Sequence, residues 1–268
     1  MYSIKEIPNH NIKEFFTQKK EYCVCIPVIN EGDKIRKQLE RMSNADISSY
    51  VDIIICDGGS SDGSLDDVFL RKNNVRVILE KKDTGKLSAQ LRMGYYYALE
   101  KCSYKGIVTI DGNNKDSVEN IRDIVDKLEE GYDLIQASRF IPGGEAINTP
   151  LIRHLAVKLI HIPAISYMAG FKYTDTTNGF RGYSRKFLED SRVEPFRNIF
   201  QSYELLAYLS VRAPQLGYKV IETPVCRKYP PKGKIPTKIS FVKGNSKLLS
   251  ILKDLYLHKY DPKQDNEV

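Results

Sequence analysis

Short apolar runs alternate with longer amphipathic stretches through the first half of the chain. The short runs have the length of buried strands, and the longer stretches carry apolar residues at intervals of three and four, the spacing of one helix face. Strands are predicted at residues 22–29, 51–56, 75–79, 107–110 and 133–138, and helices at residues 32–41, 87–101 and 117–130. This alternation is typical of an α/β protein with a mainly parallel, doubly wound sheet and helices on both faces.

The second half of the sequence is less regular. Residues 149–168 look helical as far as about residue 162, and Pro163 is expected to kink or stop that helix. The first twenty or so residues carry no predicted element. Further strands are predicted at residues 179–184 and 218–226, the second with Pro224 near an edge or bulge, and further helices at residues 202–212 and 241–256.

The second predicted strand runs into a glycine-rich loop, residues 57–64, with the sequence DGGSSDGS. Glycines at this place allow a ligand to approach the backbone closely, although a tight turn without a ligand would need them too. Ser61 or Asp62 is expected to cap the next helix, and Gly131 to end the helix at residues 117–130.

Composition limits the class of protein. A chain of 268 residues with 41% hydrophobic residues can bury a substantial core. No apolar run approaches the roughly 18 residues of a transmembrane helix, and the opening residues lack the apolar region of a secretory signal. The five cysteines are odd in number and include no Cys-x-x-Cys pair. Reduced, mostly buried thiols in a cytosolic protein are therefore expected.

Positive charge is concentrated near the C-terminus. The net charge is +7 and the isoelectric point about 9.0, which permits an anionic partner. Residues 227–243 contain six cations and no acid, in a proline-punctuated segment that cannot be one continuous helix. This basic tract has three interpretations: a solvated loop, a clamp for phosphates, or a contact with an anionic membrane surface.

The segment IVTIDGNNKD, residues 107–116, places polar side chains at the end of a buried strand. Ligands of open α/β sheets collect outside the carboxyl ends of the strands, so Asp111 and Asn113 are expected to face that crevice. Their oxygen atoms suit Mg²⁺ or Mn²⁺ that carries a diphosphate. The alternative is a strand-to-turn junction in which both side chains satisfy local backbone amides.

Other common site motifs are absent from the sequence. There is no Gly-x-Gly-x-x-Gly after the first strand and no Gly-x-x-x-x-Gly-Lys-Ser/Thr, which excludes the usual dinucleotide and P-loop enzymes. His154, His161 and His258 lack the spacing of metal ligands, so core packing or surface exposure is expected for them.

Four phrases occur in one order: IPVINE, CDGGSSDGS, IVTIDGNNKD, and ASRF followed by TDTTNGFRGYSR. Over about residues 22–230 this set resembles glycosyltransferase family 2, the inverting nucleotide-sugar transferases with a GT-A fold, and in particular the branch of dolichyl-phosphate mannose synthases. The resemblance implies a single GT-A domain over residues 1–268. Its parts would be a nucleotide-sugar half at 22–140, an acceptor-side half at 141–240, and a terminal helix and tail at 241–268.

The resemblance also implies a donor site. It would hold the nucleotide base and ribose with Pro27, Asn30, Glu31, Asp57 and Gly59. Members of the family often carry two adjacent acids where this chain has Asp57-Gly58. Lys86 and Arg92 would approach the nucleotide or face solvent.

Asp111 and Asn113 stand at the ends of the family's Asp-x-Asp metal motif. The amide of Asn113 offers oxygen but no charge, so weaker binding of Mg²⁺ or Mn²⁺ is expected. Lys115 occupies a place where some relatives have another oxygen ligand, and it would contact the donor diphosphate. Asp116 would restore a metal ligand or cap the following helix.

On the acceptor side, the resemblance implies an anion pocket of Arg139, Arg181 and Arg185, because guanidinium groups fit phosphate oxygens. Arg227, at the start of the basic tract, is also expected to bind substrate. Asp175 and Glu204 are placed beside the acceptor, and with Asp111 they form the predicted catalytic set. A hydroxyl acceptor needs a general base, whereas an ionised lipid phosphate does not.

The leading hypothesis is an inverting glycosyltransferase that moves a sugar from a nucleotide diphosphate sugar to a polyprenyl phosphate or a surface glycan. No nucleic-acid partner is expected. The protein would be cytoplasmic and at most peripheral at the inner face of the membrane, with the terminal helix either buried or interfacial. Two rivals are a sugar-phosphate nucleotidyltransferase and a non-catalytic protein that binds nucleotide sugar or lipid phosphate.

Overall fold

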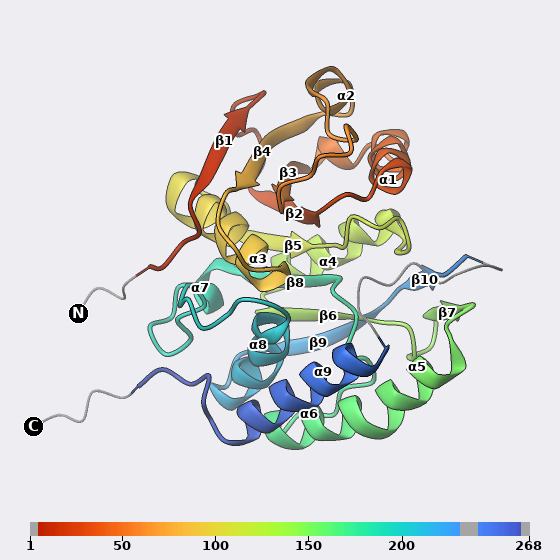
Figure 1. Ribbon diagram of the computed structural model, residues 1–268, viewed down its shortest axis with the longest axis vertical. Helices are drawn as coiled ribbons and strands as arrows, with labels where there is room; N and C mark the ends of the chain where they lie inside the picture. The colour runs from red at the N-terminus through yellow and green to blue at the C-terminus, as the bar shows by residue number, and fades with distance from the viewer. Residues whose placement is uncertain (1–4, 231–240, 264–268) are drawn as a thin grey trace, which may run out of the picture.

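The structure is a computed structural model that describes residues 5–230 and 241–263. A sheet with the strand order β1-β4-β3-β2-β5-β8-β6-β9 runs through the centre of the molecule (Figure 1). Its strands are β1 (His10–Glu14), β2 (Tyr22–Val28), β3 (Val51–Asp57), β4 (Val75–Lys81), β5 (Gly106–Thr109), β6 (Leu134–Ser138), β8 (Arg181–Ser184) and β9 (Val220–Pro224). A smaller parallel pair joins β7 (Glu145–Ile147) to β10 (Cys226–Lys228).

Most neighbouring strands of the large sheet are parallel, which confirms the predicted α/β sheet. Their carboxyl ends therefore lie along one edge of the sheet, called the carboxyl edge below. β8 is antiparallel to both β5 and β6, so it begins at the carboxyl edge and ends at the opposite one. β1 is an antiparallel strand at the outer edge, paired with β4. The sequence did not reveal β1, because HNIKE is exposed and shows no apolar alternation.

Side chains of the central strands divide between two hydrophobic cores. In β2, Val24 and Ile26 join one core, and Cys23 and Cys25 join the other, because successive side chains of a strand point to opposite faces. The first core contains α1 (Asp33–Asn44), α2 (Asp67–Lys72) and α4 (Ile121–Glu129). The second contains α3 (Leu87–Tyr96), α6 (Ile162–Ala169), α7 (Arg185–Leu188), α8 (Glu204–Gln215) and α9 (Phe241–Tyr256).

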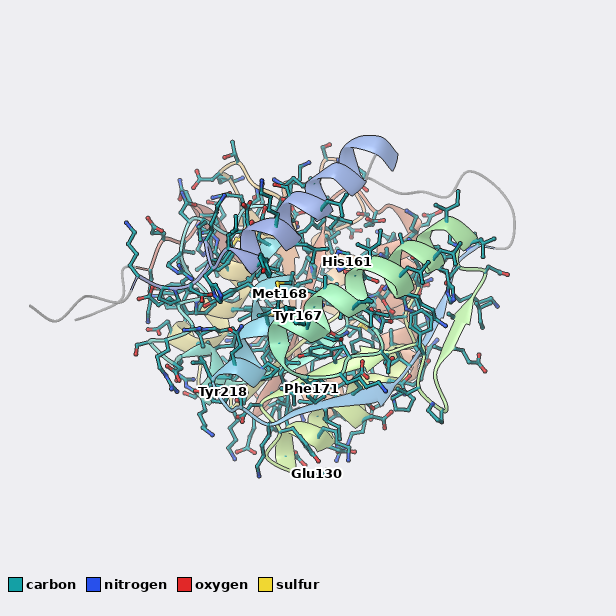
Figure 2. All side chains as sticks on the ribbon, turned by 90° about the horizontal axis from the view of Figure 1, so that it is seen from below. Glu130, His161, Tyr167, Met168, Phe171 and Tyr218 are labelled. Atoms are coloured by element: carbon teal, nitrogen blue, oxygen red, sulfur yellow. The ribbon has the colours of Figure 1, made fainter. Side chains whose placement is uncertain are left out.

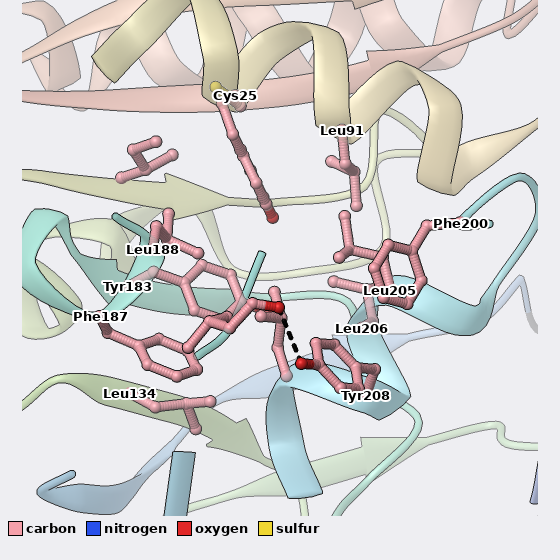
Figure 3. Packing of buried hydrophobic residues seen from close by; sticks show 14 of the residues in the cluster. Cys25, Leu91, Leu134, Tyr183, Phe187, Leu188, Phe200, Leu205, Leu206 and Tyr208 are labelled. Atoms are coloured by element: carbon pink, nitrogen blue, oxygen red, sulfur yellow. Dashed lines mark hydrogen bonds between the residues drawn. The ribbon is translucent and has the colours of Figure 1, made fainter. Parts of the chain in front are cut away.

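The second core is rich in aromatic residues. Tyr183 of β8 and Phe187 of α7 stack with ring centroids 6.4 Å apart, and Phe200 lies 5.0 Å from Tyr208 of α8 (Figure 3). The Tyr208 hydroxyl donates to the Val193 carbonyl at 2.7 Å, so its polar end is satisfied inside the core. The cysteines are free thiols, and three of them are buried, as the sequence predicted.

The predicted cap of the helix after β3 is wrong. α2 is capped by Asp66, whose carboxylate accepts from the Phe69 amide at 2.9 Å, and not by Ser61 or Asp62. The Asp62 carboxylate instead accepts from the Gly32 amide at 2.8 Å and so ties the loop to the start of α1. The loop between β3 and α2 therefore also contacts the segment that follows β2.

Pro163 does not end the helix that was predicted at residues 149–168. α5 (Leu151–Ala156) continues through a π-helical turn (Val157–His161) into α6, with Pro163 in the first turn of α6. Pro163 has no amide hydrogen, so the helix lacks one backbone donor at this position. Pro224, as predicted, lies in an edge strand, β9.

α9 matches the predicted terminal helix in its bounds. Ile251, Leu252 and Leu255 are buried, and the helix packs on α6 and α8. Leu249, on the same helix, is 52% exposed. Residues 231–240 of the basic tract lie outside the described residues. Within residues 5–230 and 241–263, none of the helices combines the length and apolar character needed to cross a membrane.

Candidate functional site

Polar residues that follow different strands meet at the carboxyl edge of the sheet. Asn30 comes after β2, Asp57 ends β3, Asp111 comes after β5 and Arg139 comes after β6. The parallel pairing of β2 with β3 and β5 puts the first three ends side by side. β8 starts at this edge, which brings the preceding segment, residues 174–180, to the same place.

On the donor side, Asp57 and Asn30 hold the glycine-rich loop through its backbone. The Ser60 amide donates to Asp57 Oδ1 at 3.0 Å, and the Ser61 amide donates to Asn30 Oδ1 at 2.8 Å. Asp57 is buried, and this burial raises the pKa of its carboxyl although the hydrogen bonds from Ser60 oppose the shift. Gly59 lies in the loop with φ +94°. These contacts form a polar cradle at the ends of β2 and β3.

The glycine after Asp57 is required by close packing. A Cβ atom on Gly58 would lie 2.9 Å from Gln90 Nε2 and 3.2 Å from the Ile29 side chain. Gln90 cannot easily move, because its amide donates to the Val28 carbonyl at 2.7 Å and to the Cys56 carbonyl at 2.8 Å. A second acid at position 58 therefore does not fit this arrangement.

At the centre of the edge, one guanidinium group links two carboxylates. Arg227 Nη2 donates to Asp111 Oδ2 at 3.0 Å, and Arg227 Nη1 pairs with Asp116 Oδ2. Arg227 is buried; burial alone would lower its pKa, but the carboxylates of Asp116 and Asp111 outweigh it and raise the pKa. Burial also raises the pKa of the Asp116 carboxyl, against the opposing charge of Arg227. Asp116 thus forms a buried ion pair and does not cap the next helix.

Asn113 lies beside Asp111 after the end of β5. Asn113 Nδ2 donates to Asp111 Oδ2 at 3.2 Å. Asn113 Oδ1 is buried and accepts no hydrogen bond from any residue that the structure describes. Gly179 lies against the carboxylate, since a Cβ there would be 2.7 Å from Asp111 Oδ1. A carboxylate beside an unsatisfied amide oxygen fits a hard cation such as Mg²⁺ or Mn²⁺.

The other predicted donor residues lie at or after the carboxyl ends of β2, β4 and β5. Lys115 Nζ lies 4.8 Å from the centroid of the Tyr229 ring. The buried Pro27 accepts from the Gly112 amide at 3.3 Å, which fixes the turn after β5 to β2. Glu31 Oε2 accepts from Lys34 Nζ at 2.9 Å. Lys86 is exposed at the start of α3, at the loop that follows β4.

Arg139 and Asp175 form a buried bidentate pair. Arg139 Nε donates to Asp175 Oδ2 at 2.6 Å and Nη2 to Oδ1 at 2.9 Å. Glu222 of β9 accepts from the backbone amides of Thr174 and Asp175 at 2.9 and 3.1 Å. These hydrogen bonds hold the segment around Asp175 against β9. Burial raises the pKa of Glu222 against these hydrogen bonds. The Asp175 carboxylate orients Arg139 in this arrangement.

The other two arginines of the predicted anion pocket, Arg181 and Arg185, do not converge with Arg139. Arg181 is buried beneath the edge, where it donates to the carbonyls of Asn178 and Thr176, each at 3.0 Å. Arg185 follows the antiparallel β8 to the opposite edge and donates to the Leu99 carbonyl at 2.6 Å. The prediction that Arg185 lies near the acceptor is therefore wrong.

Arg92 neither approaches the cradle nor faces solvent. Its Nη2 donates to Asn198 Oδ1 at 3.0 Å and its Nη1 to the Phe196 carbonyl at 3.4 Å. Burial lowers the pKa of this side chain. Arg92 fastens α3 to the segment that precedes α8.

Glu204 lies at the start of α8. Its carboxylate accepts from the Ser202 amide at 2.5 Å and hydroxyl at 2.9 Å, and Lys247 Nζ of α9 lies 3.4 Å away. The side chain is 7% exposed. Glu204 therefore joins the beginning of α8 to α9.

Sequence reasoning missed two groups that the fold brings near these residues. Asn178 Oδ1 accepts from Arg227 Nη1 at 3.3 Å, and its presence in the phrase TDTTNGFRGYSR was the available signal. His161 has no hydrogen-bond partner on either ring nitrogen among the described residues. Burial and the positive charge of Arg181 lower the pKa of His161 to about 4, although the negative charge of Asp175 opposes this shift. For His161 the sequence left core packing and surface exposure open, and it did not indicate that Arg181 and Asp175 are neighbours.

Comparison with known proteins gives a consistent family assignment. The sequence model of glycosyl transferase family 2 matches residues 23–192. Polyprenol monophosphomannose synthase of Mycolicibacterium smegmatis is 26% identical over 205 residues, which are 75% of each chain. Undecaprenyl-phosphate mannosyltransferase of Micrococcus luteus is 25% identical over 205 residues, 75% of this chain and 80% of that protein.

Among solved structures, glucosyl-3-phosphoglycerate synthase of Mycobacterium tuberculosis, in complex with Mn²⁺, uridine diphosphate and glucosyl-3-phosphoglycerate, superposes with a TM-score of 0.59. The superposition covers 93% of this chain and 82% of that one, at 14% sequence identity. The likeness confirms the GT-A type of fold.

Proposed function

The chain belongs to glycosyl transferase family 2, and on this premise we propose that it transfers a sugar, with inversion, from a nucleoside diphosphate sugar to a polyprenyl phosphate. The observation that carries the proposal is the polar centre at the carboxyl edge, where Asp111, Asn113 and Arg227 adjoin the donor cradle. The two mannosyltransferase relatives act on polyprenyl phosphates by name, which supports this acceptor class. Family membership favours glycosyl transfer over nucleotidyl transfer and non-catalytic binding.

The cradle of Asn30 and Asp57 would bind the nucleotide base and ribose. Asp57 already accepts hydrogen bonds from Ser60, and a carboxylate has room for more than two donors. Its raised pKa means that the donor-binding, ionised form is lost at a higher pH than for an ordinary aspartate. The sugar diphosphate would then extend from the cradle toward Asp111, with Lys115 and Lys86 as candidate contacts for its charge.

Mg²⁺ or Mn²⁺ would be held by the Asp111 carboxylate and Asn113 Oδ1, a buried oxygen atom that accepts no hydrogen bond from the described residues. A bound divalent ion neutralises charge on a departing diphosphate. Arg227 holds the Asp111 carboxylate in place and balances its charge when no ion is bound. Because Asn113 contributes no charge, we propose a low affinity for the ion.

In the reaction, an oxygen of the acceptor phosphate attacks the anomeric carbon from the face opposite the diphosphate. The bond from the anomeric carbon to the diphosphate oxygen breaks, and its electron pair leaves with the nucleoside diphosphate. The acceptor phosphate is already ionised, so no residue has to remove a proton. Arg139, oriented by Asp175, is the proposed contact for the acceptor phosphate; Asp175 is then a positioning residue.

The test compares acceptors on one enzyme preparation. Purified protein, a panel of nucleotide sugars and Mn²⁺ are incubated with a short isoprenyl phosphate or with a glycan acceptor, and released nucleoside diphosphate is measured. The proposal expects release with the isoprenyl phosphate and little effect of Glu204→Gln on that rate. Transfer to the glycan alone, with a severe loss in Glu204→Gln, would instead assign a hydroxyl acceptor and a base role for Glu204. Release with neither acceptor would contradict the proposed function.

A further inference from the structure

The continuous helix from α5 to α6 exposes a row of large apolar side chains. Leu151, Leu155 and Leu159, spaced four residues apart, are 70%, 46% and 71% exposed, and Tyr167 is 79% exposed. On the opposite side of the same helix, Ile165 is buried. The spacing places the exposed side chains along one side of the helix, away from the core. The row is thus a second apolar face that the fold does not cover.

α9 extends this surface. It packs beside α6, and Leu249, Tyr256 and the following Leu257 are 52%, 62% and 50% exposed. Tyr167 and Tyr256 line a groove of about 430 Å³ where the ends of the two helices meet. Figure 2 looks onto this side of the molecule and shows both helices lying along it. The exposed apolar side chains of α5, α6 and α9, with Leu257, are called the helical face below.

Charge around the helical face is strongly positive. Residues 151–169 and 241–260 together contain six lysines or arginines and a single acid, Asp254. Lys158 and Lys253 are exposed, and Asp254 is paired with Lys259 at 2.7 Å. A second copy of this chain would bring like charges together, whereas anionic lipid headgroups would be attracted to them. Exposed tyrosines beside leucines also suit the boundary between headgroups and acyl chains.

The helical face adjoins the candidate active site. α5 begins just after β7, and β7 pairs with β10, which carries Arg227. The Asn148 amide between β7 and α5 donates to the Tyr229 carbonyl at 3.1 Å. A surface that lies on the helical face would therefore be close to the residues around Asp111. This is the geometry needed by an acceptor whose hydrocarbon chain stays in a membrane while its phosphate enters the site.

We propose that the helical face docks on an anionic membrane surface, with its leucines and tyrosines in the headgroup region and its lysines on lipid phosphates. The inference rests on the proposed function for its purpose, since a polyprenyl acceptor resides in a membrane. The choice of this surface depends on the exposure of its apolar side chains, on its positive charge and on its position beside the candidate active site.

The test is co-sedimentation of the full chain with phosphatidylcholine vesicles that contain or lack phosphatidylglycerol. The protein is expected to bind the anionic vesicles. The double variant Leu155→Asp, Leu159→Asp should weaken binding about tenfold or more, because it places two charges in the apolar contact. Lys158→Gln should weaken it about fivefold, and added salt should weaken it further. Val68→Asp is the matched control, since Val68 is 79% exposed on the distant α2.

Two results would overturn the docking surface. One is that anionic vesicles do not bind the wild-type chain, or bind the double variant and the wild type equally. The other is that light scattering finds a dimer that the double variant dissociates, with unchanged vesicle affinity, which would assign the helical face to a second copy.

Transfer to a short, water-soluble isoprenyl phosphate, measured without vesicles, separates this inference from the proposed function. The double variant should match the wild type in that assay and lose activity only when the acceptor is embedded in vesicles. Loss of wild-type transfer in solution would instead count against the function itself.

Discussion

The two sides of the carboxyl edge, the proposed donor side around Asp57 and the proposed acceptor side around Arg139, hold their charged groups by different means. On the donor side, the carboxylates of Asp57 and Asp62 accept from amides of the loops at the ends of β2 and β3, such as Ser60 and Gly32. On the acceptor side, charges are held by buried ion pairs between side chains far apart in sequence. Arg227 and Asp116 are separated by 111 residues, and Arg139 and Asp175 by 36.

This difference predicts different responses to change. A carboxylate that accepts only from loop amides can lose its charge at a modest cost, because the remaining polar atom keeps part of the interaction. A buried ion pair has already lost its hydration, so removal of one partner leaves an uncompensated charge in the interior. The acceptor side should therefore be the more fragile of the two, in stability as well as in activity.

The largest expected effect is on turnover at the boundary between the two sides. Asp111→Ala removes the carboxylate that would hold the metal ion and also one partner of Arg227. We expect the initial rate of nucleoside diphosphate release to fall about a thousandfold. Asp126→Asn is the control, because Asp126 pairs with Arg122 on the exposed side of α4. Near-normal turnover of Asp111→Ala would remove Asp111 from the proposed mechanism.

The contrast in stability is tested by one neutralised acid on each side. Asp175→Asn should lower the free energy of unfolding by about 4 kcal/mol, because Arg139 stays buried beside a neutral group. Asp62→Asn, on the exposed donor loop, should lower it by about 1 kcal/mol or less. Urea titration measures both. The double variant Arg139→Met, Asp175→Leu should recover most of the loss, and equal losses in the two single variants would refute the contrast.

His161 should give the acceptor side a pH dependence of its stability. His161 has a folded-state pKa of about 4 against an ordinary value of 6.5. Well above pH 6.5, His161 is neutral in both the folded and the unfolded state and does not make the free energy of unfolding depend on pH. Between pH 6.5 and about 4 only the unfolded chain gains the proton, so the free energy of unfolding falls as the pH is lowered, by about 3 kcal/mol at most.

His161→Leu should remove this part of the pH dependence, as followed by urea titration from pH 7 down to about 4. The exposed His258→Gln is the control and should retain the wild-type profile. If the profiles of the wild type and His161→Leu are the same, burial of a neutral His161 is wrong.

On the donor side, the effect should appear in binding more than in stability. Asp57→Asn preserves the shape of the side chain beside Ser60 but removes its negative charge. A base N–H or a ribose hydroxyl would donate to that charge in the proposed complex. We expect the nucleoside diphosphate Kd to rise about tenfold by calorimetry, with a small change in stability. Asp67→Asn, an exposed residue of α2, is the control. An unchanged Kd would contradict the assignment of the nucleotide to this cradle.

The smallest expected effect concerns the metal ion. Asn113→Asp adds one negative charge next to Asp111, so Mn²⁺ affinity should increase about fivefold, measured by Mn²⁺ electron paramagnetic resonance without substrate. Asn114→Asp, on the adjacent residue whose amide donates to Gln38, is the control. If Asn113→Asp and Asn114→Asp raise the Mn²⁺ affinity equally, the increase comes from the added negative charge and not from a ligand at position 113.

Predictions from the sequence were most accurate where structure is determined locally. The strands β2, β3, β5 and β6 were found from their apolar runs, and their polar ends identified Asp57, Asp111 and Arg139 as neighbours of one edge. β1 was missed because an edge strand that is mostly exposed needs no apolar alternation. The start of α2 was misplaced because two nearby residues, Asp62 and Asp66, are equally good caps by sequence.

The sequence by itself determined the family, the mainly parallel sheet and the carboxyl edge as the place of the site, because apolar period and strand-end residues are local properties. Only the tertiary structure decided the partners of the arginines. The antiparallel direction of β8 sent Arg185 to the opposite edge, and chain packing buried Arg92 and paired Arg227 with two acids. Charge partners and exposed faces depend on which segments meet in space, and pairings between distant residues leave no periodic trace in one sequence.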